Sequence, residues 1–184
     1  MERDIEITDG FITLRPYQMS DIDSLYEAVR ESITEVSLWM PWCHSEYSIE
    51  ESTTWVEGLP ERWEMGTSFD FAITKAKNGQ YCGGCGLNHL RYDIGLANLG
   101  YWVRTNETRK GIATAATLLL ARFGFKELRL NRVEIMVAVG NIASLRIAEK
   151  SGATREGVLR NRLLLNGEPG DAVLFSFVPQ DFRQ

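Results

Sequence analysis

A short polar turn between a predicted strand and a predicted helix carries the residue types that bind phosphate. The segment Thr105–Gly111 contains the adjacent cations Arg109 and Lys110 and ends in a glycine. The amides and the positive dipole end of a helix N-terminus attract anions, and Gly111 lets the backbone approach closely. No bulky polar side chain follows in Ile112–Thr114. This pattern predicts a phosphate site, and the alternative is an ordinary turn with solvated cations.

Two common nucleotide-binding loops do not match this chain. A Walker A loop carries its lysine directly after a glycine, whereas Lys110 precedes Gly111. A dinucleotide fingerprint beginning at Gly84 needs a third glycine at position 89, where this chain has His89, and no helical pattern follows. The sequence therefore supports neither of these nucleotide-binding folds.

Cys82 and Cys85 form a Cys-x-x-Cys pair, which raises the alternative of a thiol redox or metal site with Cys43, His44 or His89. A redox pair normally begins a helix, where the pKa of the thiol is lowered. Here the pair lies in a strand pattern, in which residues three apart face opposite sides of the sheet. One such pair without a second is also a weak zinc signal, so we expect no bound metal.

Composition and charge limit the classes of partner. Twenty Lys and Arg against 25 Asp and Glu give a net charge of -5, without the basic surplus of nucleic-acid or anionic-membrane binders. The densest apolar stretch, Ile112–Ala121, is shorter than the roughly 18 residues that span a bilayer. The acidic start, Met1–Glu6, has no apolar core of a signal peptide, and three cysteines fit a reducing compartment. We expect a cytoplasmic protein that binds neither nucleic acid nor membrane.

The elements that position these residues follow from apolar periodicity and turn residues. Ser20 or Asp21 opens a first helix, and Ser48 with Glu51 forms a capping box for a second. Two more helices are predicted from Gly111 to about Leu128 and over Ile142–Ser151. Alternation predicts seven strands, which lie at Phe11–Pro16, Phe69–Thr74, Tyr81–Leu90, Ala97–Val103, Arg132–Val139, Gly157–Leu165 and Ala172–Val178.

This order of elements predicts an α+β fold. Three consecutive strands with short turns form an antiparallel meander, and Asn166-Gly167 marks a turn between the last two strands. The strand, helix and strand from Ala97 to Val139 need a right-handed crossover. We therefore expect a mixed, mostly antiparallel sheet with one parallel junction, and the last strands could pair with a second chain in a homodimer.

The chemistry-bearing segments resemble the GNAT superfamily of N-acetyltransferases. Thr108-Arg-Lys-Gly-Ile-Ala113 is similar to its acyl-CoA pyrophosphate loop, Arg/Gln-x-x-Gly-x-Gly/Ala, with Thr108 in place of the usual cation or Gln. The segment from Asn141 through Ser144 to Glu156-Gly157 resembles its Asn-x-x-Ser…Gly-Phe…Glu-Gly pattern. Three further segments resemble the Rim-type branch, which acetylates protein N-termini and other amines. They are Gly100-Tyr-Trp, Trp39-Met-Pro-Trp42 and Asn166-Gly167…Asp171.

The resemblance covers residues 8–179, which we take as a single domain with helices on both faces of the sheet and a splayed parallel strand pair. It implies that acetyl-CoA lies in the splay and that the backbone amide of Val103 stabilises an oxyanion. Ser144 is placed as the proton donor to the CoA thiolate, although a capping or solvated hydroxyl is the alternative. The implied cosubstrate-binding residues are Trp102, Val103, Arg104, Arg109, Lys110, Gly111, Ile112, Ala113, Thr114, Asn141 and Ser144.

The acceptor and the general base are less defined by sequence. The strand before Asn166-Gly167 offers no carboxylate, which leaves His89, or His44, as the imidazole base. An α-amine with a pKa near 7.7–8 is on the order of 10% neutral at pH 7 and needs no base. We expect a protein or peptide N-terminus, such as a ribosomal protein, or a small amine, held by Trp39, Trp42 and Tyr47. A catalytically silent acyl-CoA-binding module is the alternative.

Overall fold

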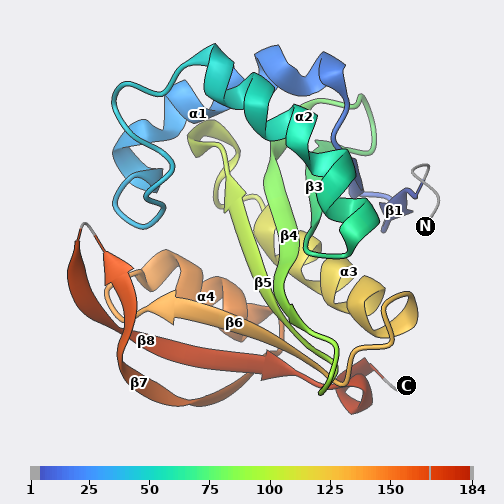
Figure 1. Ribbon diagram of the computed structural model, residues 1–184, viewed down its shortest axis with the longest axis vertical. Helices are drawn as coiled ribbons and strands as arrows, with labels where there is room; N and C mark the ends of the chain where they lie inside the picture. The colour runs from blue at the N-terminus through green and yellow to red at the C-terminus, as the bar shows by residue number, and fades with distance from the viewer. Residues whose placement is uncertain (1–4, 166, 183–184) are drawn as a thin grey trace.

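The computed structural model describes residues 5–165 and 167–182 (Figure 1). Within them, one eight-stranded sheet has the order β1-β2-β3-β4-β5-β6-β8-β7. The strands are β1 (Ile7–Thr8), β2 (Ile12–Pro16), β3 (Phe69–Lys75), β4 (Tyr81–Arg91), β5 (Leu96–Val103), β6 (Arg132–Ala138), β7 (Thr154–Leu165) and β8 (Glu168–Phe177). The longer helices are α1 (Ile22–Val36), α2 (Ile49–Met65), α3 (Ile112–Lys126) and α4 (Ile142–Lys150).

The element order agrees with the sequence prediction, apart from the additional two-residue strand β1. The predicted capping box is present at the start of α2, where the Ser48 amide donates to Glu51 Oε2 at 2.9 Å. β7 begins earlier than predicted, and register shifts after Arg155 and Leu159 interrupt its alternation. β8 also begins earlier, because Glu168–Gly170 pairs with the end of β7. The predicted turn residue Asn166 lies outside the described residues.

Helices cover both faces of the sheet, as predicted. α3 packs on one face with a core that includes Phe71, Leu120 and Phe175, all fully buried. α1 and α2 cover the other face around Val29 and Val56 (Figure 1). No helix in the described ranges is both long and apolar enough to cross a membrane.

The predicted parallel junction lies between β5 and β6, and the two strands separate after it. In the described sheet they pair only where Leu96–Asn98 faces Arg132–Glu134. Beyond this point β5 continues along β4, and β6 continues along β8. Figure 1 shows the resulting V-shaped divergence, beyond which the facing edges of the two strands do not pair with each other. The mostly antiparallel sheet with a splayed parallel pair is confirmed.

Candidate active site

The outer half of β5 offers main-chain groups to the opening between the two strands. The Arg104 amide donates to the Cys82 carbonyl at 2.9 Å, and antiparallel pairing alternates between bonded and non-bonded residues. Trp102, two residues earlier, therefore also directs its main chain toward β4, while Tyr101 and Val103 direct theirs toward the opening. The main-chain groups of Tyr101 and of the predicted Val103 are thus without a partner in β4, whereas those of Trp102 and the Arg104 amide are engaged by β4.

The N-terminus of α3 begins a short way beyond the end of β5. The first helical bond runs from the Ala115 amide to the Gly111 carbonyl at 3.0 Å, so the amides of Ile112, Ala113 and Thr114 have no acceptor inside the helix. Ile112 and Ala113 bury their side chains and can meet a ligand only through these amides. Gly111 has φ +84°, and a Cβ there would meet no atom within 4 Å. Free amides of this kind at a helix N-terminus can hold an anion.

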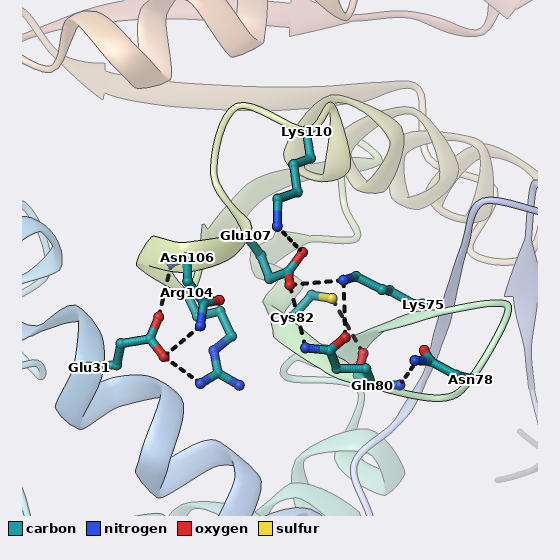
Figure 2. A network of polar contacts seen from close by, with 9 residues as sticks. All are labelled: Glu31, Lys75, Asn78, Gln80, Cys82, Arg104, Asn106, Glu107 and Lys110. Atoms are coloured by element: carbon teal, nitrogen blue, oxygen red, sulfur yellow. Dashed lines mark hydrogen bonds and ion pairs between the residues drawn. The ribbon is translucent and has the colours of Figure 1, made fainter.

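A buried carboxylate holds the loop before α3. Glu107 lies in the 3₁₀ turn η2 (Thr105–Glu107), and its Oε1 accepts from Lys75 at 2.8 Å and its Oε2 from Lys110 at 3.1 Å (Figure 2). Burial opposes ionisation of Glu107, but the hydrogen bonds from both lysines outweigh it and lower its pKa. Lys110 therefore anchors the loop, whereas Arg109 has no ion-pair partner among the described residues and has φ +63°.

A second set of contacts ties η2 to α1. The Arg104 guanidinium forms an ion pair with Glu31, and Glu31 also accepts from the Asn106 amide at 2.9 Å (Figure 2). The Arg104 hydrogen bond lowers the pKa of Glu31. The side chain of Arg104 thus positions the loop rather than pointing to a phosphate. Glu31 and Glu107 together define the path by which the chain leaves β5 and enters α3.

The predicted Asn141 and Ser144 lie across the opening from β5. Asn141 caps α4, and its Oδ1 accepts from the Ser144 amide at 3.1 Å. The Ser144 hydroxyl is 2.9 Å from the hydroxyl of Tyr101, which also donates to the Ser144 carbonyl at 3.1 Å. Burial raises the pKa of Tyr101 to about 12, partly offset by the Ser144 contact. A protonated phenol therefore positions the predicted proton donor.

A cavity of about 390 Å³ lies on the opposite face of β5, beneath α1 and α2. Trp42 and Tyr47, two of the predicted acceptor-binding residues, line it together with Trp102, and the Trp42 and Trp102 ring centroids are 5.5 Å apart. Trp39 is not in this lining; its ring lies near Gly140, on the far side of the opening, where an added Cβ would be 3.3 Å away. The loop between α1 and α2 therefore touches both the cavity and the start of α4.

A carboxylate in this cavity was not among the residues predicted from the sequence. Asp70 of β3 lines it, and its Oδ2 accepts from the Ser68 hydroxyl at 2.6 Å. Burial raises the pKa of Asp70, opposed by the Ser68 hydrogen bond and the charge of Arg62. An aspartate between Phe69 and Phe71 is unusual in a strand, and that local exception was the available signal. His89 is exposed at the far end of β4 and His44 pairs with Glu51, so neither imidazole is among the cavity-lining residues.

The cysteine pair has the opposite character to a redox site. Cys43, Cys82 and Cys85 are buried free thiols, and burial raises the pKa of each of them. A redox pair needs a stabilised thiolate. Among residues 5–165 and 167–182, no three potential metal ligands gather in one place.

A family profile described as an acetyltransferase (GNAT) domain matches residues 12–154. The chain belongs to the GNAT acetyltransferase family. YdaF of Bacillus subtilis, described as a ribosomal N-acetyltransferase, is 30% identical over 182 residues, covering 94% of this chain and 93% of its own. These matches confirm the expected family, its Rim-type branch and the acyltransferase activity.

Solved GNAT structures show the same fold. A Vibrio cholerae protein described as a ribosomal-protein-serine acetyltransferase has a TM-score of 0.85 and 27% identity, covering 97% of this chain and all of its own. The microcin C7 self-immunity acetyltransferase MccE, solved with acetyl-CoA and AMP, has a TM-score of 0.83 at 24% identity, with 97% of both chains covered. MccE therefore holds acetyl-CoA, the cosubstrate that the sequence predicts for this chain, on the same fold.

Proposed function

We propose that this GNAT protein transfers the acetyl group of acetyl-CoA to the α-amine of a protein or peptide N-terminus, or to a small primary amine. The observation that carries the proposal is the open β5 edge at Tyr101 and Val103, which leads to the unpaired first-turn amides of α3. The edge fits an extended pantetheine arm, and the amides with Arg109 fit its pyrophosphate.

Groups on the two sides of the opening have different roles in the reaction. The acceptor nitrogen attacks the thioester carbon, and the Val103 amide donates to the oxygen on which negative charge develops. When the intermediate collapses, the C–N bond stays, the C–S bond breaks, and Ser144 Oγ gives its proton to the departing thiolate. Ser144 regains a proton from the acetylated nitrogen through water, so the products are an amide and free CoA.

The aromatic cavity supports an acceptor that carries its amine on a small or apolar group. Trp42, Tyr47 and Trp102 supply flat apolar walls, and the volume is in the range of small-ligand sites. Relatives described as ribosomal-protein acetyltransferases support an N-terminal residue of a protein as the occupant. The three free thiols support a reaction in the reducing cytoplasm.

An acetyl-transfer screen tests this proposal. Purified protein is incubated with acetyl-CoA and a panel of N-terminal peptides and small amines, and product masses and free CoA are measured. We expect acetylation of α-amines and a loss of about 100-fold in kcat for Ser144→Ala, with acetyl-CoA affinity nearly unchanged. Binding of acetyl-CoA without turnover on any amine would instead support the silent acyl-CoA-binding module.

A further inference from the structure

The Asp70 carboxylate leans from β3 across the sheet toward β5. Asp70 pairs with Gly86 of β4, and Gly86 pairs with Gly100 of β5. A Cβ on Gly86 would overlap Asp70 Oδ1, so this oxygen occupies the space that a side chain on β4 would fill. The absence of a Cβ at position 86 is therefore required by the direction of the carboxylate.

The path from Asp70 to β5 is kept open by a second glycine. At Gly100 the nearest side-chain atom to an added Cβ is 3.9 Å away, on Asn88. Gly86 of β4 and Gly100 of β5 thus leave the sheet surface next to the carboxylate free of side chains. Oδ2 is engaged by Ser68, while Oδ1 receives no hydrogen bond from the described residues. Asp70 Oδ1 is therefore available to a ligand, and it faces β5 over the two glycines.

The surroundings of Asp70 suit an organic cation. The aromatic rings of Trp42, Trp55 and Trp102 line the same cavity, and ring faces attract ammonium groups. Water is partly excluded there, which strengthens a charge-assisted hydrogen bond to Oδ1.

Other ionisable groups around the carboxylate come from α2, from the segment after β2 and from β4. Arg62 of α2 contributes positive charge, while Glu51 of α2, Tyr17 after β2 and Cys85 of β4 share the cavity lining. Burial raises the pKa of both Tyr17 and Cys85. Those two groups therefore stay neutral near pH 7. The carboxylates of the lining are Asp70 and Glu51; Glu51 is held by the Ser48 amide, which lowers its pKa, and by His44.

We propose that Asp70 is a catalytic residue that binds the acceptor as its ammonium ion and takes one proton from it. This inference rests on the proposed function and names the group that selects cationic acceptors. The nitrogen loses a first proton to Asp70 Oδ1, attacks the thioester carbon, and loses its second proton as the C–S bond breaks. The Asp70 proton then passes to solvent. The balance is one ammonium ion and one thioester converted to one amide, one thiol and one solvent proton.

Binding and turnover test this assignment separately. The probes are 2-phenylethylammonium and its neutral analogue 2-phenylethanol, and binding is followed by quenching of the cavity tryptophans. We expect the wild-type protein to bind the ammonium at least tenfold more tightly than the alcohol and Asp70→Asn to lose this preference. Asp93→Asn, which alters an exposed aspartate paired with Arg91, is the matched control. Equal preference in Asp70→Asn and wild type would overturn the proposal.

The pH profile adds a readout that a structural role would not move. The acid limb of kcat/KM follows the ionisation of Asp70, so the rate falls as pH falls through its pKa. Ser68→Ala removes a hydrogen bond that favours the ionised form, and it should move this limb to higher pH. Asp70→Asn should lose the limb and about 100-fold in kcat/KM, with acetyl-CoA affinity unchanged. An unmoved limb in Ser68→Ala would contradict a role for Asp70.

Ammonium preference without acetyl transfer would instead refute the proposed function and leave Asp70 as the cation-binding group.

Discussion

The hydroxyl of Tyr101 on β5 lies 2.9 Å from the hydroxyl of Ser144 on α4. The same phenol donates to the Ser144 carbonyl at 3.1 Å, so one side chain spans the place where β5 and β6 have already separated. The contact holds α4 against the open strand and orients the serine hydroxyl. It links the two halves of the sheet on either side of the opening in which we propose that acetyl-CoA binds.

Removal of this hydroxyl is expected to slow turnover more than it weakens cosubstrate binding. Tyr101→Phe should lower kcat about tenfold and the free energy of unfolding by about 1 kcal/mol, because Ser144 loses its partner. Steady-state kinetics, calorimetric acetyl-CoA titration and chemical denaturation measure the three effects. Tyr92→Phe is the matched control, since it deletes an exposed hydroxyl that donates to the Gly66 carbonyl at 2.8 Å. Equal kcat values for the two variants would rule out a positioning role.

Bulk at the start of α3 is expected to block the phosphate site. Gly111→Trp should abolish acetyl-CoA binding, because the indole would fill the open space over the first-turn amides. Gly10→Trp is the matched control, because it introduces the same backbone strain. At Gly10 φ is +85°, and an added Cβ also meets no atom within 4 Å. Calorimetric titration should show binding in the control only. Binding by Gly111→Trp would refute the location of the site.

The two adjacent cations of the turn are expected to differ. Arg109→Ala should weaken acetyl-CoA binding about tenfold, equivalent to about 1.4 kcal/mol, since Arg109 has no ion-pair partner among the described residues. Lys110→Ala should have a smaller effect on affinity, because its ammonium is held by Glu107 at 3.1 Å. When acetyl-CoA is titrated at two salt concentrations, the affinity of Lys110→Ala should depend more steeply on salt than that of Arg109→Ala, because Lys110→Ala retains Arg109. The reverse order of the two variants would contradict this division.

Loss of the loop carboxylate is expected to reduce stability in a pH-dependent way. Glu107→Gln should lower the free energy of unfolding near pH 7 by about 1.5–3 kcal/mol, because two charge-assisted hydrogen bonds weaken. The folded-state pKa of Glu107 lies below its unfolded value. Its contribution is therefore complete above the unfolded pKa of about 4.3 and is lost as pH falls through the folded pKa.

Denaturation of wild type and Glu107→Gln from pH 3 to 7 measures this difference. The exposed Glu64→Gln is the control and should show no comparable loss. A constant difference between wild type and Glu107→Gln across the range would show that the carboxylate does not act through its charge.

Most elements could be predicted from the sequence because their signals are local. The capping box at Ser48 and the alternation of Phe69–Thr74 each involve residues that are close together in the sequence. The start of α3 was equally accessible, since Gly111 and the first turn of the helix are contiguous. Irregularities within a strand were not accessible, and the register shifts of β7 moved its observed start to Thr154.

The sequence by itself determined the helices, the strands, the parallel crossover and the position of the turn at which we predict phosphate binding. Only the tertiary structure decided which groups meet around the opening. Tyr101 reaches Ser144 across 43 positions, and Asp70 faces β5 because the registers of three strands align it with Gly86 and Gly100. Such contacts depend on strand pairing and on the absence of a Cβ at a partner position. No periodicity within a single segment encodes them.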